Sequence, residues 1–147
     1  MIIVIDASVA AKWFFQEEHS MEAINLLDNH FEINVPDFFF LEMKSLLCKR
    51  TRRRELSLKE ALEMDDEIRS IPIQSFPSAA LRDKAFEIAL ETRSSIYDCL
   101  YLALAEALDS NMVTADRRFF QALQNASLFS RMLWVEDIDM ARGGGSS

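Results

Sequence analysis

Three aspartates stand next to segments that have the pattern of a buried strand or helix. The stretch SIYDCLYLALAEAL, residues 95–108, is apolar at nearly every position, yet Asp98 lies near its start. Asp6 directly follows the run IIVI, and Asp116 comes just past the short run NMVT. Burying a carboxylate without a partner is unfavourable by several kcal/mol, so each of these acids needs a physical reason to be there.

A fourth acid projects from the apolar side of a predicted helix. One helical turn to either side of Glu42 the residues are apolar, namely Phe38, Phe39 and Leu46. Four carboxylates gathered at one place would repel one another unless a cation lay between them. Hard oxygen ligands with no accompanying His or Cys select Mg²⁺ or Mn²⁺ over zinc, so the sequence predicts a site for one of these ions.

Each acid also has a purely structural interpretation. Asp98 could complete a capping box with Ser95, and Asp116 could cap a helix. Asp6 could bond the backbone of a local turn, and Glu42 could be paired with a nearby Lys or Arg. Independent capping does not predict that all four acids fall at the same end of one sheet, and this coincidence favours a shared metal site.

The elements that must position these acids alternate between short β-rich runs and longer helical runs. Strands are expected near residues 2–5, 32–35, 71–76, 111–114 and 132–135. Helices are expected near residues 8–15, 20–29, 37–54, 78–91 and 95–108, from Ser57 in a capping box, and from Asp116. Five strands separated by helices predict an α/β fold with a mostly parallel sheet covered on both faces. Ligands bind such sheets beyond the carboxyl ends of the strands, where the four acids would meet.

Four segments, in this order, resemble the signature of the PIN-domain family: VIDASV, FFFLEMKSLL, SIYDCLYLALAE and NMVTADRRF. More narrowly, they resemble the ribonuclease toxins of VapBC-type toxin–antitoxin pairs. The resemblance covers nearly the whole chain, and its most diagnostic parts are YD–LYLALAE and VTADRRF. It implies a Rossmann-like three-layer fold with strand order 3-2-1-4-5, and Mg²⁺- or Mn²⁺-dependent cleavage of RNA that leaves a 5′-phosphate and a 3′-hydroxyl.

The resemblance also implies a set of site residues by motif position. Ser8 and Thr114 match polar positions that line the metal site and support its ligands. Ser45 departs from the family pattern, because many members have Asn there, and Cys99 replaces a small residue. The implied catalytic and metal-binding acids are Asp6, Glu42, Asp98 and Asp116, of which the first three would hold the main ion while Asp116 helps to hold a second or orients water.

The chain has one dense basic run, KRTRRR at residues 49–54. One interpretation is favourable placement against the negative end of a helix dipole on a solvated face. Another is a phosphate track toward the acids, and an acidic antitoxin could equally bind there. The candidate RNA or phosphate contacts are Arg52, Arg53, Arg54, Arg117 and Arg118.

Composition and charge exclude several classes of protein. The formal net charge of −8 argues against a non-specific nucleic-acid binder. No apolar run approaches the roughly 18 residues that cross a bilayer, and the start lacks the basic segment of a signal peptide, so we expect a cytoplasmic protein without a membrane partner. The family resemblance further implies an RNA substrate, a homodimer and a cognate antitoxin.

The chain is expected to be one domain, residues 1–140, followed by a flexible Gly/Ser tail at residues 141–147. His19 and His30 accompany no Ser or Cys nucleophile motif, and both are expected on the surface. The two cysteines lie in apolar helical contexts, which favours buried free thiols. The alternative to a nuclease is a non-catalytic PIN-like module that acts through protein or RNA contacts.

Overall fold

A computed structural model describes residues 1–28 and 30–138 of the chain. The five strands are β1 (Ile2–Ile5), β2 (Glu32–Pro36), β3 (Ile73–Phe76), β4 (Asn111–Thr114) and β5 (Met132–Trp134). The α-helices are α1 (Ala7–Phe14), α2 (Ser20–Asn25), α3 (Phe38–Arg52), α4 (Leu58–Ser70), α5 (Arg82–Thr92), α6 (Ile96–Ala107) and α7 (Arg117–Ala122). Short 3₁₀ turns are η1 (Ser78–Leu81), η2 (Phe129–Arg131) and η3 (Val135–Asp137).

The strands form one sheet in the order β3-β2-β1-β4-β5, and every neighbouring pair is parallel. The predicted α/β class and the strand order 3-2-1-4-5 are therefore confirmed. β1 is central, with Ile3 aligned to Ile33 of β2 on one side and to Asn111 of β4 on the other. Because all strands run the same way, their carboxyl ends lie along one edge of the sheet.

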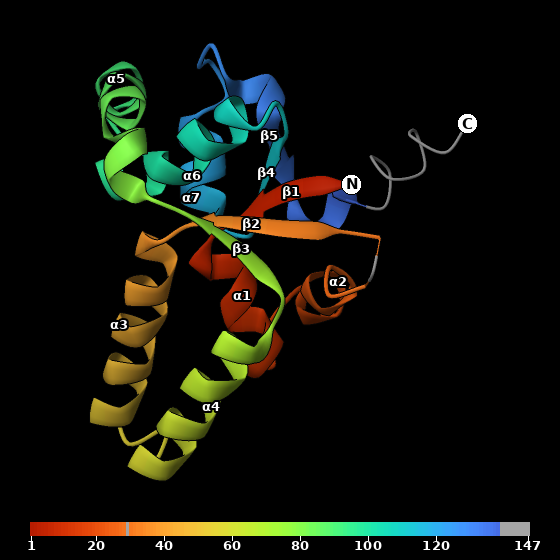
Figure 1. Cartoon of the computed structure of the whole chain (residues 1–147), viewed down its shortest axis with the longest axis vertical. Helices are drawn as coiled ribbons and strands as arrows, with labels where there is room; N and C mark the ends of the chain where they lie inside the picture. Colours follow the sequence, from red (N-terminus) through yellow and green to blue (C-terminus); the bar gives the residue numbers. More distant parts are fainter. Residues whose placement is uncertain (29, 139–147) are drawn as a thin grey trace.

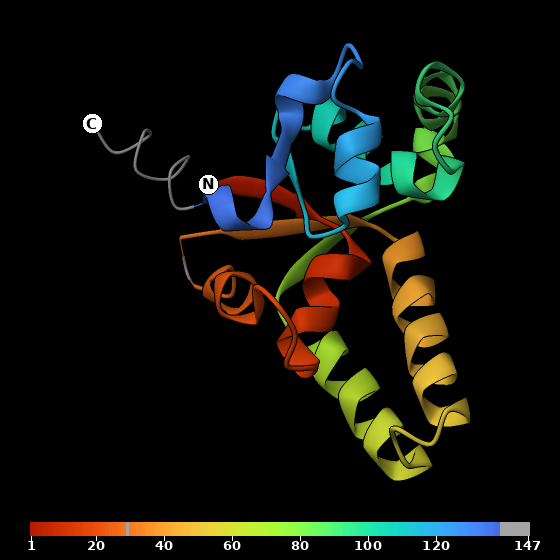
Figure 2. The same cartoon turned by 180° about the vertical axis from the view of Figure 1, so that it is seen from behind.

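Helices cover both faces of the sheet and make three layers. In Figure 1, α1, α2, α3 and α4 lie below the sheet, and α5, α6 and α7 lie above it. The view from behind shows the same layers, with α3 and α4 running side by side away from the sheet (Figure 2). Because helices cover both faces of β1, Ile3, Val4 and Ile5 are fully buried. This coverage explains why the strand is a continuous apolar run.

Helix α6 is the buried helix of the fold. Its residues from Cys99 to Ala105 are all buried. Tyr101, Leu102 and Leu104 belong to the largest fully buried side chains of the described residues. The helix contacts β1, β2, β4 and α5, so it is enclosed on every side after its first turn. The nearly uninterrupted apolar sequence of this segment follows from that position.

Local details differ from expectation at four places. Asp6, rather than Ser8, caps α1, because its side chain accepts the Val9 N–H. Helix α2 ends at Asn25, before the expected 29, and β3 begins at Ile73 instead of 71, since Pro72 before it cannot donate to a strand ladder. The segment expected as one helix from 78 begins as the turn η1. The capping box at Ser57 is confirmed.

Two side chains lie in surroundings other than those expected. His19 is not a surface residue: its side chain is 13% exposed and packs edge-on against Trp134, because the turn before α2 folds it onto the end of the sheet. His30 is exposed, as expected. Both cysteines are free, but only Cys99 is buried, since Cys48 lies on the outward side of α3.

No helix within the described part of the chain is both long and apolar enough to cross a membrane. The predicted boundary between a domain at 1–140 and a tail at 141–147 lies outside the described residues.

Candidate active site

The four acids identified in the sequence all lie at the carboxyl edge of the sheet. Asp6 follows β1 and caps α1, while Asp116 follows β4 and caps α7. Glu42 lies in the second turn of α3, the helix that follows β2, and Asp98 lies in the first turn of α6. The parallel topology thus brings residues that are up to 110 positions apart to one place.

Asp6 is held by hydroxyl groups on both of its carboxylate oxygens. Ser8 Oγ donates to Oδ1 and Thr114 Oγ1 donates to Oδ2, each at 2.5 Å. The two hydroxyls in turn accept the backbone N–H groups of Ala115 and Asp116, at 3.0 and 3.1 Å. These relays join the ends of β1 and β4 and fix the orientation of the carboxyl group.

Burial dominates the electrostatics of Asp6. The side chain is almost fully enclosed, and the loss of hydration raises its pKa from 3.8 to about 6. The hydrogen bonds from Ser8, Thr114 and the Val9 N–H oppose this increase, and repulsion from Asp116 adds to it. The charged form of Asp6 is therefore less favourable here than in water, and a bound cation would restore it.

Glu42 is positioned by a buried tyrosine. The Tyr101 hydroxyl, one turn beyond Asp98 on α6, donates to Glu42 Oε1. Burial raises the pKa of Glu42 from 4.5 to about 7; the bond from Tyr101 opposes this, and the charges of Asp6 and Asp98 reinforce it. Burial and the nearby carboxylates also raise the pKa of Tyr101, so its hydroxyl remains a donor.

Asp98 and Asp116 complete the group from the side of α6 and α7. Burial raises the pKa of Asp98, and repulsion from Asp116 raises it further. Ser95 caps α6 by accepting the Tyr97 N–H at 3.2 Å, but the reciprocal bond from the Ser95 N–H to Asp98 is absent, so the alternative role of Asp98 in a capping box is not fulfilled. Asp116 accepts the Phe119 N–H through Oδ1 at 3.1 Å, so its structural interpretation as a cap is confirmed.

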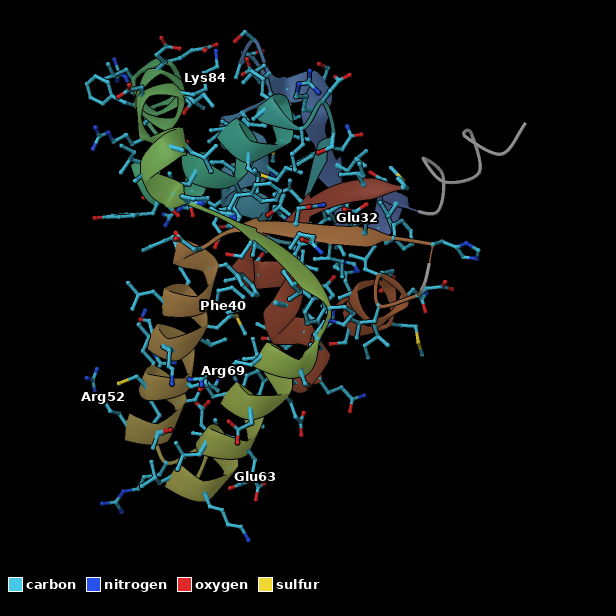
Figure 3. The ribbon with its side chains drawn as sticks, in the orientation of Figure 1. Glu32, Phe40, Arg52, Glu63, Arg69 and Lys84 are labelled. Atoms are coloured by element: carbon cyan, nitrogen blue, oxygen red, sulfur yellow. The ribbon has the colours of Figure 1, made fainter. Side chains whose placement is uncertain are left out.

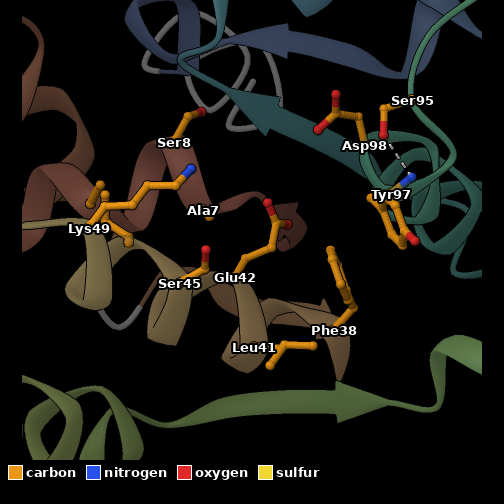
Figure 4. Close-up of a pocket in the computed structure, with 12 residues that line it drawn as sticks. Ala7, Ser8, Phe38, Leu41, Glu42, Ser45, Lys49, Ser95, Tyr97 and Asp98 are labelled. Carbon is orange, nitrogen blue, oxygen red and sulfur yellow. Dashed lines mark hydrogen bonds between the residues drawn. The ribbon is translucent and has the colours of Figure 1, made fainter.

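A pocket of about 570 Å³ opens beside the acids, between α1, α3 and the start of α6. Glu42 and Asp98 line it, with Ser8 and Ser45 (Figure 4). The Lys49 side chain extends along one end of the pocket in the same view, and Phe38 and Tyr97 lie at the other end. Asp98 also lines a smaller pocket of about 330 Å³, which it shares with Asp116 and Arg118.

The arginines predicted from the sequence are distributed over different surfaces. Arg52 lines the groove between α3 and α4 and lies near the outer end of α3 (Figure 3). Arg117 lies over the Trp134 ring, 4.9 Å from its centre, whereas Arg118 lines the pocket of Asp98 and Asp116. Arg53 and Arg54 follow at the end of α3, so Lys49 is the member of the basic run that lines the larger acid pocket.

The donor chemistry of the site fits a hard divalent cation. The available ligands are carboxylate oxygens supported by hydroxyls. The thiol of Cys99, which follows Asp98, is fully buried, and burial raises its pKa, so it stays protonated. Three of the carboxyl groups have raised pKa values because of burial and mutual repulsion, which a bound cation would reverse. Among residues 1–28 and 30–138, no three Asp, Glu, His or Cys side chains are close enough to form a complete metal site.

Sequence reasoning missed Tyr101, Lys49 and Tyr97. Tyr101 stands in an apolar run where a core residue is expected. Its position three residues after Asp98 is the one indication that both side chains lie on the same face of the helix. Lys49 was part of the basic run, but the run itself does not indicate which of its members faces the acids. Tyr97 precedes Asp98 directly, and neighbouring residues on a helix do not share a face.

Comparison with known proteins shows the family to which the chain belongs. The profile of the family described as PIN domain matches residues 3–124. Ribonuclease VapC3 of Pyrobaculum aerophilum is 32% identical over 122 residues, 80% of this chain and 92% of that protein. Ribonuclease VapC9 of Mycobacterium tuberculosis is 30% identical over 117 residues, 80% of this chain and 87% of that protein. The chain therefore belongs to the PIN-domain family. Its similarity to VapC proteins confirms the narrower resemblance seen in the sequence.

Solved structures share the fold. A crystal structure from Pyrobaculum aerophilum has a TM-score of 0.64 at 18% identity, over 98% of this chain and 96% of the other. VapBC2 from Rickettsia felis, bound to a promoter DNA fragment, has a TM-score of 0.64 at 14% identity, over 91% and 98%. VapC20 of Mycobacterium tuberculosis, a toxin that cleaves the sarcin–ricin loop, has a TM-score of 0.62 at 19% identity, over 82% and 94%.

Proposed function

We propose that this chain is a ribonuclease that hydrolyses RNA phosphodiester bonds with the help of Mg²⁺ or Mn²⁺. The observation that carries the proposal is that Asp6, Glu42, Asp98 and Asp116 all lie along one edge of the sheet, and that Glu42 and Asp98 line an open pocket there. The curated relatives at 30% and 32% identity, both named as ribonucleases, support the same activity. The non-catalytic alternative lacks a comparable observation in its favour.

The four acids would hold the cation, and other residues of the chain would prepare them for it. Ser8 and Thr114 orient both oxygens of Asp6, and Tyr101 orients Glu42. When bound, the ion supplies an acidified water and stabilises charge on the phosphate oxygens. Asp116 has one oxygen engaged by the Phe119 N–H and its other oxygen available for the ion or for water.

The decisive test is RNA cleavage by Asp98→Asn in the presence of Mn²⁺. We expect the rate to fall by more than about 100-fold, since loss of even an outer partner in a metal site costs roughly 10- to 100-fold. Asp66→Asn, which changes an exposed acid of α4, is the matched control and should cleave like the wild type. Wild-type cleavage by Asp98→Asn with unchanged Mn²⁺ affinity would refute the assignment, and failure of the wild-type chain to cleave any RNA would favour the non-catalytic alternative.

We also propose that the chain is the toxin of a type II toxin–antitoxin pair, acts in the cytoplasm and forms a homodimer. Support for an antitoxin partner comes from the structural neighbours, which include VapBC2 and FitAcB of Neisseria gonorrhoeae, the latter with a TM-score of 0.58. Growth arrest on expression, reversed by the protein encoded beside this one, tests the pairing. The molar mass of the purified chain in solution tests the homodimer.

A further inference from the structure

Two aromatic side chains form a stacked pair at one end of the acid pocket. Phe38 begins α3 and Tyr97 lies in the first turn of α6, and their rings stack with centres 4.9 Å apart and planes inclined by 20°. Both rings line the pocket that contains Glu42 and Asp98 (Figure 4). The pair therefore lies next to two of the proposed catalytic acids.

The outer member of this pair is exposed although it is aromatic. Tyr97 is 56% exposed, and Leu41 on the same pocket wall is 64% exposed. Contact with Phe38 accounts for one face of the Tyr97 ring only. The capping bond from the Tyr97 N–H to Ser95 Oγ fixes the start of α6, so the ring has a defined position relative to the neighbouring Asp98.

The chemistry of the pocket matches one nucleotide of an unpaired strand. A flat aromatic surface stacks on any nucleobase, but only when the base is free of its own helix. At the opposite end, Lys49 offers a cation to a phosphate, and Glu42 lies between Lys49 and the aromatic pair, while Asp98 lies beside Tyr97 (Figure 4). The volume of about 570 Å³ lies within the range of about 300–1,000 Å³ that is usual for ligand pockets.

We infer that Tyr97, supported by Phe38, is a stacking platform for the nucleobase next to the scissile phosphate. The inference rests on the proposed ribonuclease function. The competing explanation is that the two rings only pack α3 against α6. In that case the loss of Tyr97 would change stability and not the recognition of bases.

The experiment measures RNA binding in EDTA, where cleavage does not interfere. Three fluorescent probes of about 12 nucleotides, within the usual size of single-strand sites, are compared: a mixed-sequence single strand, the same strand in a duplex, and an abasic ribose-phosphate oligomer. Tyr97→Ala should weaken binding of the single strand by roughly 5- to 150-fold, the usual effect of losing one base–aromatic stack. The same change should leave binding of the abasic oligomer unaltered.

Three further variants make the result specific. Tyr97→Phe should bind the single strand like the wild type, whereas Tyr97→Leu, which keeps an apolar contact with Phe38, should behave like Tyr97→Ala. Phe86→Ala, which removes a similarly exposed aromatic (55%) from α5, is the matched control and should have no effect.

The inference is overturned if Tyr97→Ala binds the single strand as tightly as Phe86→Ala does. It is also overturned if Tyr97→Ala weakens binding of the abasic oligomer as much as binding of the single strand. Cleavage by the wild-type chain with Mn²⁺ is measured separately. Cleavage without a role for Tyr97 would refute the platform alone, and Tyr97-dependent binding without any cleavage would refute the nuclease alone.

Discussion

At the scale of single residues, the site depends on side chains that touch the acids and do not themselves belong to the metal-binding set. Tyr101 is fully buried, and its hydroxyl meets Glu42 across the boundary between α6 and α3. Ser8 and Thr114 do the same for Asp6 across β1 and β4. In each case a hydroxyl selects one orientation of a carboxyl group whose charged form is unfavourable because it is buried.

Removing one hydroxyl should therefore impair the site without unfolding the protein. We expect Tyr101→Phe to reduce the RNA cleavage rate by about 10- to 100-fold and to raise the Mn²⁺ concentration needed for half-maximal activity, because Glu42 loses its orienting donor. Thr51→Val removes a hydroxyl that bonds only within α3, to the Leu47 carbonyl, and is the control. An unchanged dependence on Mn²⁺ in Tyr101→Phe would show that the tyrosine has only a packing role.

At the scale of elements, α3 must be held at a fixed place for Glu42 to reach the other acids. Its start is joined to η1 by a reciprocal pair of hydrogen bonds: Phe38 N–H donates to Ser78 Oγ, and Ser78 N–H donates to Asp37 Oδ1, each at 3.0 Å. These contacts connect the segment after β2 with the segment after β3. The bonds from Ser78 hold the pKa of Asp37 below its ordinary value of 3.8.

This contact makes part of the stability depend on pH. Because the folded-state pKa of Asp37 is lowered, its contribution is present above pH 3.8 and is lost as the pH falls through the folded-state value. We expect Asp37→Ala to reduce the free energy of unfolding by about 0.5–1 kcal/mol at neutral pH, since the pair is exposed. The difference from the wild type should vanish in acid.

Urea unfolding of both proteins, from neutral pH to below 3.8, measures this dependence. Asp66→Ala removes an exposed acid from the middle of α4 and is the control for the loss of one surface charge. A difference between Asp37→Ala and the wild type that stays constant over the whole range would contradict the prediction.

At the scale of the whole molecule, an acidic protein has to bind a polyanion. The net charge of −8 opposes the approach of RNA, so local cations must compensate for it near the site. Lys49 lines the acid pocket, while Arg52 lines the groove between α3 and α4. The phosphate role predicted for Arg52, Arg53 and Arg54 stays a prediction, and the placement of Lys49 supplies a nearer candidate.

The salt dependence of RNA binding distinguishes these cations. We expect Lys49→Ala to reduce the slope of log affinity against log salt by about 1, the value for one lost phosphate contact. Lys59→Ala changes the net charge equally but lies on α4, where it pairs with Glu63, so it should leave the slope unchanged. Equal slopes for the two variants would mean that Lys49 contributes only to the overall charge of the protein. A reduced slope in Arg52→Ala would support the phosphate contact predicted for Arg52.

The sequence alone was sufficient for the fold class, the strand order and the family. The run IIVI before Asp6 marks a parallel strand, because a strand covered on both faces is apolar throughout, and the shorter run NMVT before Asp116 follows the same pattern less completely. The all-apolar segment after Asp98 marks a buried helix for the same reason. The resemblance in four separate segments added the order of the strands, and the sheet confirms it.

The amino-acid sequence identifies which side chains are chemically unusual, namely four acids that stand next to segments with the pattern of buried strands and helices. The packing of the chain establishes which groups support these acids, such as Tyr101 for Glu42 and Lys49 instead of Arg52 at the pocket. Strand and helix patterns report burial, which is a local property of the sequence. The contact between Tyr101 of α6 and Glu42 of α3 joins residues 59 positions apart, and it depends on how the two helices pack against each other.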